Sequence, residues 1–302
     1  MNARYRINSC DGLGLVNSVC TATKHSFYVP ELASLLSIKA VLSGRAVLTI
    51  DGRKLMARDG TFVVVNDRQR FALTIESREL TTMFCIFFAR GFVEDIWRST
   101  VTPTSELLDD SRPDPRQTRF FDRVETQTGS VLPSLQPFQR LIASGQLTPA
   151  RWDETFLRLG TELVQAQEEV LRRAQKIPAA KTSTRLELCR RLLRGRDFLL
   201  SSWDHRLKLN DVARQACLSP YHFHRAFTRF FGKTPHHFLS DYRLERAAAQ
   251  LRLSERSVTE LSADCGFESL PSFSNLFQRR YGISPREYRR TSARNSKIRK
   301  IG

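Results

Sequence analysis

Residues 219–235 read SPYHFHRAFTRFFGKTP, and residues 269–285 read SLPSFSNLFQRRYGISP. Both stretches start with Ser, contain Phe-x-x-x-Phe-x-Arg, and end with Gly followed by Thr-Pro or Ser-Pro. Matching positions lie 50 residues apart, and just upstream Val212-Ala213 aligns with Leu261-Ser262 at an interval of 49. The chain therefore contains two copies of one structural unit, with one extra residue in the turn of the second copy.

Signals at the helix ends divide each copy into a short helix, a tight turn and a second helix. In the first copy we expect the leading helix over 210–217, and Ser219 is placed to cap the next helix, with Pro220 at its first position. In the second copy, residues 257–260 have the S-x-x-E spacing of a capping box, and Ser269 is placed to cap the following helix. Both second helices are expected to stop at a glycine, which suits a left-handed C-cap; these are Gly232 and Gly282.

Helical periodicity sorts each second helix into an aromatic face and a polar face. The aromatic faces are expected to be core: Phe223, Phe227 and Phe230 in the first copy, and Phe273, Phe277 and Tyr281 in the second. The opposite faces carry many hydrogen-bond donors of the kind that contact base edges in a major groove, although each such residue is also an ordinary solvated side chain in the alternative interpretation. These candidate base-reading residues are Tyr221, His224, Arg225 and Thr228 in the first copy, and Pro271, Ser274, Asn275 and Gln278 in the second.

A continuous helix is expected between the copies, from Pro235 to about Leu253. Its length of roughly 28 Å is close to the ~34 Å that separates successive major-groove segments on one face of DNA. Basic side chains on both units are suited to phosphate contacts. These candidates are Arg229, Lys233, Arg243, Arg279, Arg280 and Arg289.

The positive charge of the chain is concentrated at the same end. The formal net charge is +17, and residues 181–302 hold 25 Lys and Arg against 11 Asp and Glu, whereas residues 1–180 hold 23 against 20. Such a surplus indicates a polyanionic partner or a membrane surface, or simply a highly charged soluble domain. A nonspecific nucleic-acid or RNA-binding protein needs only this charge, and stays as an alternative.

The N-terminal part has the pattern of short strands between about residues 24 and 90. Asp51-Gly52, between two apolar runs, is a strong signal for a tight hairpin. Several strands at this spacing favour a small antiparallel barrel or sandwich. The expected strands cover 35–42, 46–50, 54–56, 61–65, 71–75 and 82–88.

From about residue 91 prolines interrupt the pattern, so that one long helix cannot cross this part. A cleaner helix is expected from Trp152 to Gln175, whose apolar stripe either packs on its own barrel or forms a dimer interface. We therefore expect an N-terminal domain over 1–175, a linker over 176–184, a double helix-turn-helix domain over 185–291 and a basic tail over 292–302, disordered from Arg294 to Lys300.

The motifs of the C-terminal part closely resemble those of the AraC/XylS family of bacterial transcription regulators. The resemblance runs from about Leu207 to Arg289, and its main motifs are Ser219-x-x-x-Phe223-x-Arg225-x-Phe227, Gly232-x-Thr234-Pro235, Arg243-Leu244-x-x-Ala247, Gly266-Phe267-x-Ser269 and Gly282-x-Ser284-Pro285. It implies a seven-helix DNA-binding domain that reads bases through Tyr221, His224 and Arg225 in the first unit and Ser274 and Asn275 in the second. It also implies a cupin-like N-terminal module that binds an effector and dimerises.

Two positions depart from the family pattern. Ser262 replaces a small Ala, and Leu270-Pro271 replaces the polar pair that often opens the second recognition helix. Because Pro271 removes a backbone donor, we expect the second unit to read bases weakly and to act mainly on the DNA backbone.

The sequence thus predicts an α+β protein of two domains, an N-terminal cupin-like β-barrel followed by helices and an all-α double helix-turn-helix. The expected function is sequence-specific regulation of transcription, with activation favoured by the resemblance. The expected partners are double-stranded promoter DNA, a small-molecule effector, RNA polymerase and a second copy of the chain, and a membrane is not among them. The chain lacks a hydrophobic leader and is expected in the cytoplasm.

An enzyme with zinc-bound cysteines is the remaining alternative. The six cysteines, Cys10, Cys20, Cys85, Cys189, Cys217 and Cys265, include no C-x-x-C pair and are expected to be small core residues in a reducing compartment. Residues 35–90 contain no histidine, so His25 alone cannot build a barrel metal site. We therefore expect no catalytic residues, no cofactor and no metal.

Overall fold

The computed structural model describes residues 6–7, 13–101, 120, 124–126, 132–178 and 181–298. The chain divides into two compact units, Met1–Lys176 and Ile177–Gly302, and each is considered by itself. Cys10, which was expected to be a small core residue, and three of the prolines beyond residue 91, Pro103, Pro113 and Pro115, lie outside the described residues.

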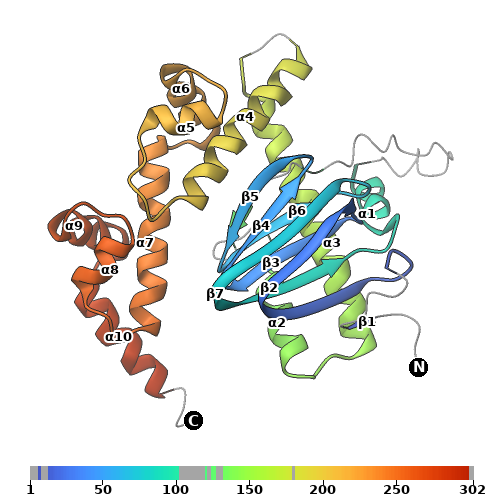
Figure 1. Cartoon of the computed structure of the whole chain (residues 1–302), viewed down its shortest axis with the longest axis horizontal. Coiled ribbons are helices and arrows are strands. Elements are labelled where there is room, and N and C mark those ends of the chain that lie inside the picture. The colour runs from blue at the N-terminus through green and yellow to red at the C-terminus, as the bar shows by residue number, and fades with distance from the viewer. Residues whose placement is uncertain are drawn as a thin grey trace. The chain divides into compact units, whose positions relative to one another are not determined.

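The strands of the N-terminal unit form one sheet that curls into a nearly closed, mostly antiparallel barrel (Figure 1). The longest strand, β7, pairs with β2 along one side, while on its other side β4 pairs with its first part and β3 with its last part. The strands are β1 (Arg6–Ile7), β2 (Ser18–Ala33), β3 (Ser37–Ser43), β4 (Arg45–Ile50), β5 (Arg53–Arg58), β6 (Thr61–Val65), β7 (Arg70–Phe87) and β8 (Val124–Thr126).

The sequence located most of these strands but divided the longest one. Segments 71–75 and 82–88 were expected to be separate, whereas β7 runs through the polar residues between them because it hydrogen-bonds to β2 on both sides of that stretch. The strand region was expected from about residue 24, but no strand was located before residue 35, since most residues of β2 beyond Cys20 are exposed and lack apolar alternation. The predicted hairpin at Asp51-Gly52 is confirmed by the pairing of β4 with β5.

The sheet buries apolar side chains on both of its faces. One set fills the barrel interior and includes Val41, Leu48, Val63, Leu73 and Met83. The other set lies on the outer face, under the helices α1 (Phe92–Val101), α2 (Leu135–Ala143) and α3 (Pro149–Gln175). Strand β6 contributes to both sets, which explains its unbroken apolar run.

Helix α3 packs its apolar stripe on its own barrel, which was one of the two alternatives for this stripe, the other being a dimer interface. Trp152 and Phe156 are fully buried in the outer cluster together with Phe138 of α2, with ring centroids 4.8–5.8 Å apart. All three tryptophans, Trp97, Trp152 and Trp203, are buried.

The described C-terminal unit is all helical. Its helices are α4 (Thr182–Ser201), α5 (Leu209–Gln215), α6 (Pro220–Phe231), α7 (Pro235–Leu253), α8 (Val258–Asp264), α9 (Leu270–Tyr281) and α10 (Pro285–Ile298). The connector helix α7 has the bounds that the sequence predicted. Other boundaries differ from the sequence analysis. Helix α5 ends two residues before the expected 217, α4 starts inside the expected linker, and α10 continues to Ile298, into the tail that was expected to be disordered.

The repeat is visible as two matching aromatic clusters. In the first, Phe227 lies 4.3 Å from Phe231 and meets Phe238 edge-to-face at 5.6 Å. In the second, Phe277 lies 4.5 Å from Tyr281 and meets Tyr288 edge-to-face at 5.3 Å. Each cluster fastens a recognition helix, α6 or α9, to the start of the helix that follows it.

The predicted caps are confirmed at both recognition helices. The Ser219 hydroxyl accepts a hydrogen bond from the His222 amide, and the Ser269 hydroxyl accepts one from the Ser272 amide. Gly232 and Gly282 end these helices with φ of 72° and 78°, in the left-handed region where only glycine is relaxed. The capping box of Ser257 and Glu260 is present with both bonds, and the amide of Ser257 lowers the pKa of the Glu260 carboxyl.

Gly195 sets the approach of α4 to α6. A Cβ at this position would lie 2.4 and 2.8 Å from two ring atoms of Phe223, which is fully buried. We expect Gly195→Ala to lower the free energy of unfolding by about 1–3 kcal/mol, because the ring cannot move without opening the core.

Gly160→Ala on α3 is the matched control in thermal denaturation. Its Cβ would meet Ile96 Cδ1 at 2.5 Å, but this atom is the tip of a flexible side chain, and both variants gain the same helix propensity. Equal losses for the two variants would contradict the role of Phe223.

Candidate nucleic-acid interface

The outer face of α6 presents an aromatic and a cationic side chain as a pair. Tyr221 is 71% exposed, and the Arg225 guanidinium lies 5.5 Å from the centre of its ring. Arg225 also donates from Nη1 to the Tyr221 hydroxyl over 3.3 Å. The pair holds the guanidinium against a rigid ring while its remaining donors stay exposed.

The other two candidates on α6 lie deeper. His224 and Thr228 are half-buried, and the Thr228 hydroxyl donates to the His224 carbonyl over 2.7 Å. Because this proton is used within the helix, Thr228 offers an incoming ligand an acceptor rather than a donor.

The outer face of α9 is exposed but carries no charge at the matching positions. Pro271, Asn275 and Gln278 are exposed and Ser274 is half-buried. The eight candidate base-reading residues therefore lie on two surfaces that the folded unit leaves open, and none of them is buried.

The candidate phosphate contacts differ in whether they already have a partner inside the protein. Arg229 and Arg279 occupy equivalent positions in the repeat and are both exposed, near the C-terminal ends of α6 and α9. The other four, Lys233, Arg243, Arg280 and Arg289, have partners within the C-terminal unit.

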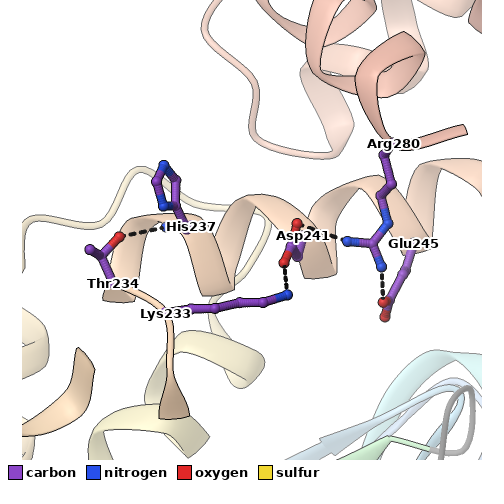
Figure 2. A network of polar contacts seen from close by, with 6 residues as sticks. All are labelled: Lys233, Thr234, His237, Asp241, Glu245 and Arg280. Carbon is purple, nitrogen blue, oxygen red and sulfur yellow. Dashed lines mark hydrogen bonds and ion pairs between the residues drawn. The ribbon is translucent and has the colours of Figure 1, made fainter. Parts of the chain in front are cut away.

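Two acids of α7 bind Lys233 and Arg280, as Figure 2 shows. Asp241 receives an ion pair from Lys233 and another from Arg280, the latter at 2.8 Å, and Glu245 also pairs with Arg280. We call Lys233, Asp241, Glu245 and Arg280 the connector clamp. It joins the end of the first recognition helix and the end of the second to the same stretch of α7.

Arg243, one of the candidate phosphate contacts, is anchored to backbone carbonyls inside the unit. Its Nε donates to the Trp203 carbonyl over 2.6 Å and its Nη2 donates to the His205 carbonyl over 2.7 Å. The half-buried guanidinium, whose pKa is lowered by burial, lies under Gly266. Arg243 thus fixes the turn after α4 to the turn between α8 and α9.

Arg289 likewise serves a neighbouring segment, since its Nη2 donates to the Arg256 carbonyl over 2.5 Å. Arg256 in turn pairs with Asp264. This brings the first turns of α10 to the loop before α8.

The two leading helices end in the same way. The Leu218 amide donates to the Ala213 carbonyl over 3.0 Å, and the Phe267 amide donates to the Ser262 carbonyl over 3.1 Å. The left-handed residue is Cys217 in the first unit, with φ of 52°, and Gly266 in the second, with φ of 73°. Ser262, which departs from the family pattern, is buried and satisfies its hydroxyl on the Thr259 carbonyl.

Sequence reasoning missed the clamp acids. Asp241 and Glu245 stand four residues apart on a helix between two basic segments, and this spacing puts both carboxylates on one face. That spacing was the available signal.

Among the described residues, no three His, Cys, Asp or Glu side chains gather as metal ligands would. No helix in the described ranges is both long and apolar enough to cross a membrane.

Residues 212–291 match the helix-turn-helix domain family. This region is an AraC-type helix-turn-helix domain. The chain is 35% identical over 86 residues to the HTH-type transcriptional regulator Rv1931c of Mycobacterium tuberculosis, covering 28% of this chain and 33% of that protein. It is 40% identical over 96 residues to the HTH-type transcriptional activator RhaS of Escherichia coli, covering 30% of this chain and 34% of that protein.

A solved transcriptional regulator with an AraC-type DNA-binding domain, from Chromobacterium violaceum, is 25% identical and covers 37% of this chain and 97% of its own, with a TM-score of 0.33. The chain spans about a third of the length of the curated relatives Rv1931c and RhaS.

Gly266 in the AraC-type domain lacks room for a side chain. A Cβ there would lie 2.8 and 2.9 Å from atoms of the anchored Arg243 guanidinium, whereas a Cβ at Gly282 meets nothing within 4 Å. Both residues have positive φ, so each alanine substitution carries a backbone cost of about 1 kcal/mol. We expect Gly266→Ala to cost about 2–4 kcal/mol and Gly282→Ala about 1 kcal/mol in denaturant unfolding.

The same measurement in an Arg243→Ala background separates the backbone cost of a positive φ from the steric cost of contact with the guanidinium. There the two glycine substitutions should cost the same, because the guanidinium is gone. A persistent difference would assign the extra cost of Gly266→Ala to another neighbour.

The connector clamp should make stability depend on pH through Glu245. Burial raises the pKa of its carboxyl above the ordinary value of 4.5, although Arg280 acts in the opposite direction. Folding therefore favours the protonated form, and the stability that this gives is complete below pH 4.5 and is lost as pH rises through the folded pKa. Relative to wild type, Glu245→Gln should gain free energy of unfolding as pH rises across that window.

Asp241→Asn is the comparison variant, because it removes the carboxylate shared by two cations. It should lose about 1 kcal/mol near neutral pH. Parallel pH curves for wild type and Glu245→Gln would rule out the inferred protonation of Glu245.

Proposed function

We propose that this protein is a sequence-specific DNA-binding regulator of transcription. The observation that carries the proposal is the repeat: two capped helix-turn-helix units, each with a buried aromatic face and an exposed polar face on its second helix. The match to the helix-turn-helix family and the names of the relatives support it. The surplus of basic residues in the C-terminal unit suits a polyanionic partner.

In this proposal α6 is the main base-reading helix. Arg225 is the residue best suited to a bidentate contact with guanine, because Tyr221 already restricts its guanidinium. His224 and Thr228 supply further contacts near the middle of the helix. Helix α9 presents Ser274, Asn275 and Gln278, and the proline at 271 leaves its first turn with one backbone donor fewer.

Arg229 and Arg279 are the proposed phosphate contacts, one near the end of each recognition helix. Lys233 and Arg280 are proposed as secondary contacts, because the clamp carboxylates already neutralise them. The 19-residue connector α7 spans roughly 28 Å, which suits two recognition helices in adjacent segments of the major groove.

The N-terminal barrel is proposed as the regulatory module, with a small-molecule effector as its ligand. The division of the chain into two compact units supports a separate module of this kind. A homodimer is proposed through the exposed side of α3, where Leu157 is 54% exposed. We also propose RNA polymerase as a partner, activation as the direction that the family resemblance favours, a cytoplasmic location and a role without catalysis.

Footprinting on genomic DNA tests the function. A protected region of about two helical turns that survives excess competitor DNA is the expected result. Protection lost uniformly to any competitor would replace the proposal with nonspecific nucleic-acid binding.

Arg225→Ala should weaken binding to the footprinted site by about 1–3 kcal/mol, or about 5- to 150-fold, and relax the preference at one base pair. Asn275→Ala should cost less, since the second unit carries fewer direct readout groups. The measurement is a titration against the site and single-base variants. Arg190→Ala, which removes an exposed arginine of α4, is the charge control and should change affinity little.

Equal losses for Arg225→Ala and Asn275→Ala would contradict the ranking of the two units. A loss in Arg190→Ala as large as in Arg225→Ala would show that charge alone is being measured.

A further inference from the structure

Two cysteines face each other across the barrel sheet. In the register of β2 with β7, Cys20 is directly opposite Cys85, and in the register of β7 with β3, Cys85 is directly opposite Lys39. Directly opposite residues of antiparallel strands point to the same side of a sheet. Cys20, Cys85 and Lys39 therefore form one row on one face of three neighbouring strands.

The spacing of such a row suits a disulfide. Opposite residues in antiparallel strands have Cα atoms about 4.5–5.5 Å apart, within the range of about 4.4–6.8 Å found in disulfides. Their Cβ atoms, about 4.5–5.5 Å apart, need to approach by about 1 Å. In the described ranges β1 pairs with β2 at Ser18 and Val19, directly before Cys20.

Cys20 and Cys85 are also less deeply buried than two of the other cysteines. Cys20 and Cys85 are both partly exposed, whereas Cys189 and Cys265 are fully buried. Burial raises the pKa of the Cys265 thiol to about 12, which leaves it inert at neutral pH. Cys217 is exposed but lies in a turn of the other unit.

Lys39 adds a positive charge beside the pair. It is only 3% exposed, and its ammonium lies 3.7 Å from the ring centre of Phe87 and 5.1 Å from that of Phe71. Phe87 is two residues from Cys85 and so shares its face of β7. A cation near a thiol in a poorly hydrated site stabilises the thiolate, the reactive form.

We propose that Cys20 and Cys85 are a redox modification site, a cross-strand dithiol that a low-molecular-weight disulfide such as oxidised glutathione converts to a disulfide joining β2 to β7. The Cys85 thiolate attacks one sulfur of the reagent, forms a mixed disulfide and releases one reagent thiolate. Cys20 then attacks the Cys85 sulfur, and the second reagent thiolate leaves. The protein gives up two electrons and two protons, and the reagent ends as two thiols.

The bond fixes the barrel edge where the exposed part of β2 begins. Residues beyond Cys20 on β2 are mostly exposed, including Phe27 and Tyr28, and pair with β7 through two register shifts. Oxidation closes this edge at its base, and reduction releases it. The site is independent of the proposed DNA-binding function.

The test uses the native full-length protein in glutathione buffers of increasing oxidised fraction, followed by alkylation and peptide mapping. The expected product has lost the mass of two hydrogens, has two thiols fewer to alkylate, and contains one peptide pair linked between Cys20 and Cys85. Reduction should restore both thiols. Cys20→Ser and Cys85→Ser should each abolish the linked pair, while Cys217→Ser should leave it intact.

Two results would overturn the proposal. One is full alkylation of Cys20 and Cys85 after oxidation of a protein whose circular dichroism is unchanged. The other is a product in which either cysteine is linked to a different cysteine or to a second chain.

The role of Lys39 has its own readout. Lys39→Met should slow formation of the linked pair about three- to tenfold near pH 7, because less of the thiol is ionised, and Lys39→Arg should restore the rate. At a pH well above the thiol pKa the three proteins should react alike. A slowing that is the same at every pH would assign Lys39 a purely structural role.

Discussion

The edge-to-face contact of Phe227 with Phe238, repeated as Phe277 with Tyr288, is the interaction on which the C-terminal unit depends. It binds each recognition helix to the helix that follows, and the buried partners Phe223 and Phe273 complete each cluster. Because a helix turns once in about 3.6 residues, fixing these rings inward also fixes which residues point outward. The exposure of Tyr221 and Arg225 is therefore a consequence of the aromatic core.

Much of the C-terminal unit was predictable because its helices are determined by residues close together in the sequence. Capping serines, glycines at helix ends and aromatic residues at helical spacing act within a few residues, so the pattern alone placed α6, α7 and α9 within about two residues. The strands β4, β5 and β6 were predictable for the same reason, since their hairpin turn and alternation are local.

The parts that escaped prediction depend on contacts between distant residues. The hydrogen bonds of Arg243 are one example, because the sequence shows its charge and not the carbonyls of Trp203 and His205, which accept from it in the turn after α4. Strand β2 is long because β7 pairs with it, although its own residues are largely exposed. The alignment of Cys20, Cys85 and Lys39 is likewise a matter of strand register, which no spacing along the chain reveals.

The connector clamp reduces the number of basic side chains in the C-terminal unit that remain available to an anionic partner. Lys233 and Arg280 are already paired with carboxylates of α7. If the protein binds DNA, these two side chains therefore displace few of the cations condensed on the DNA phosphates. Arg243 is committed to backbone carbonyls in the same way. In the proposed function, the phosphate contacts fall to exposed arginines such as Arg229 and Arg279, and we expect DNA binding to depend less on ionic strength than the formal charge of +17 implies.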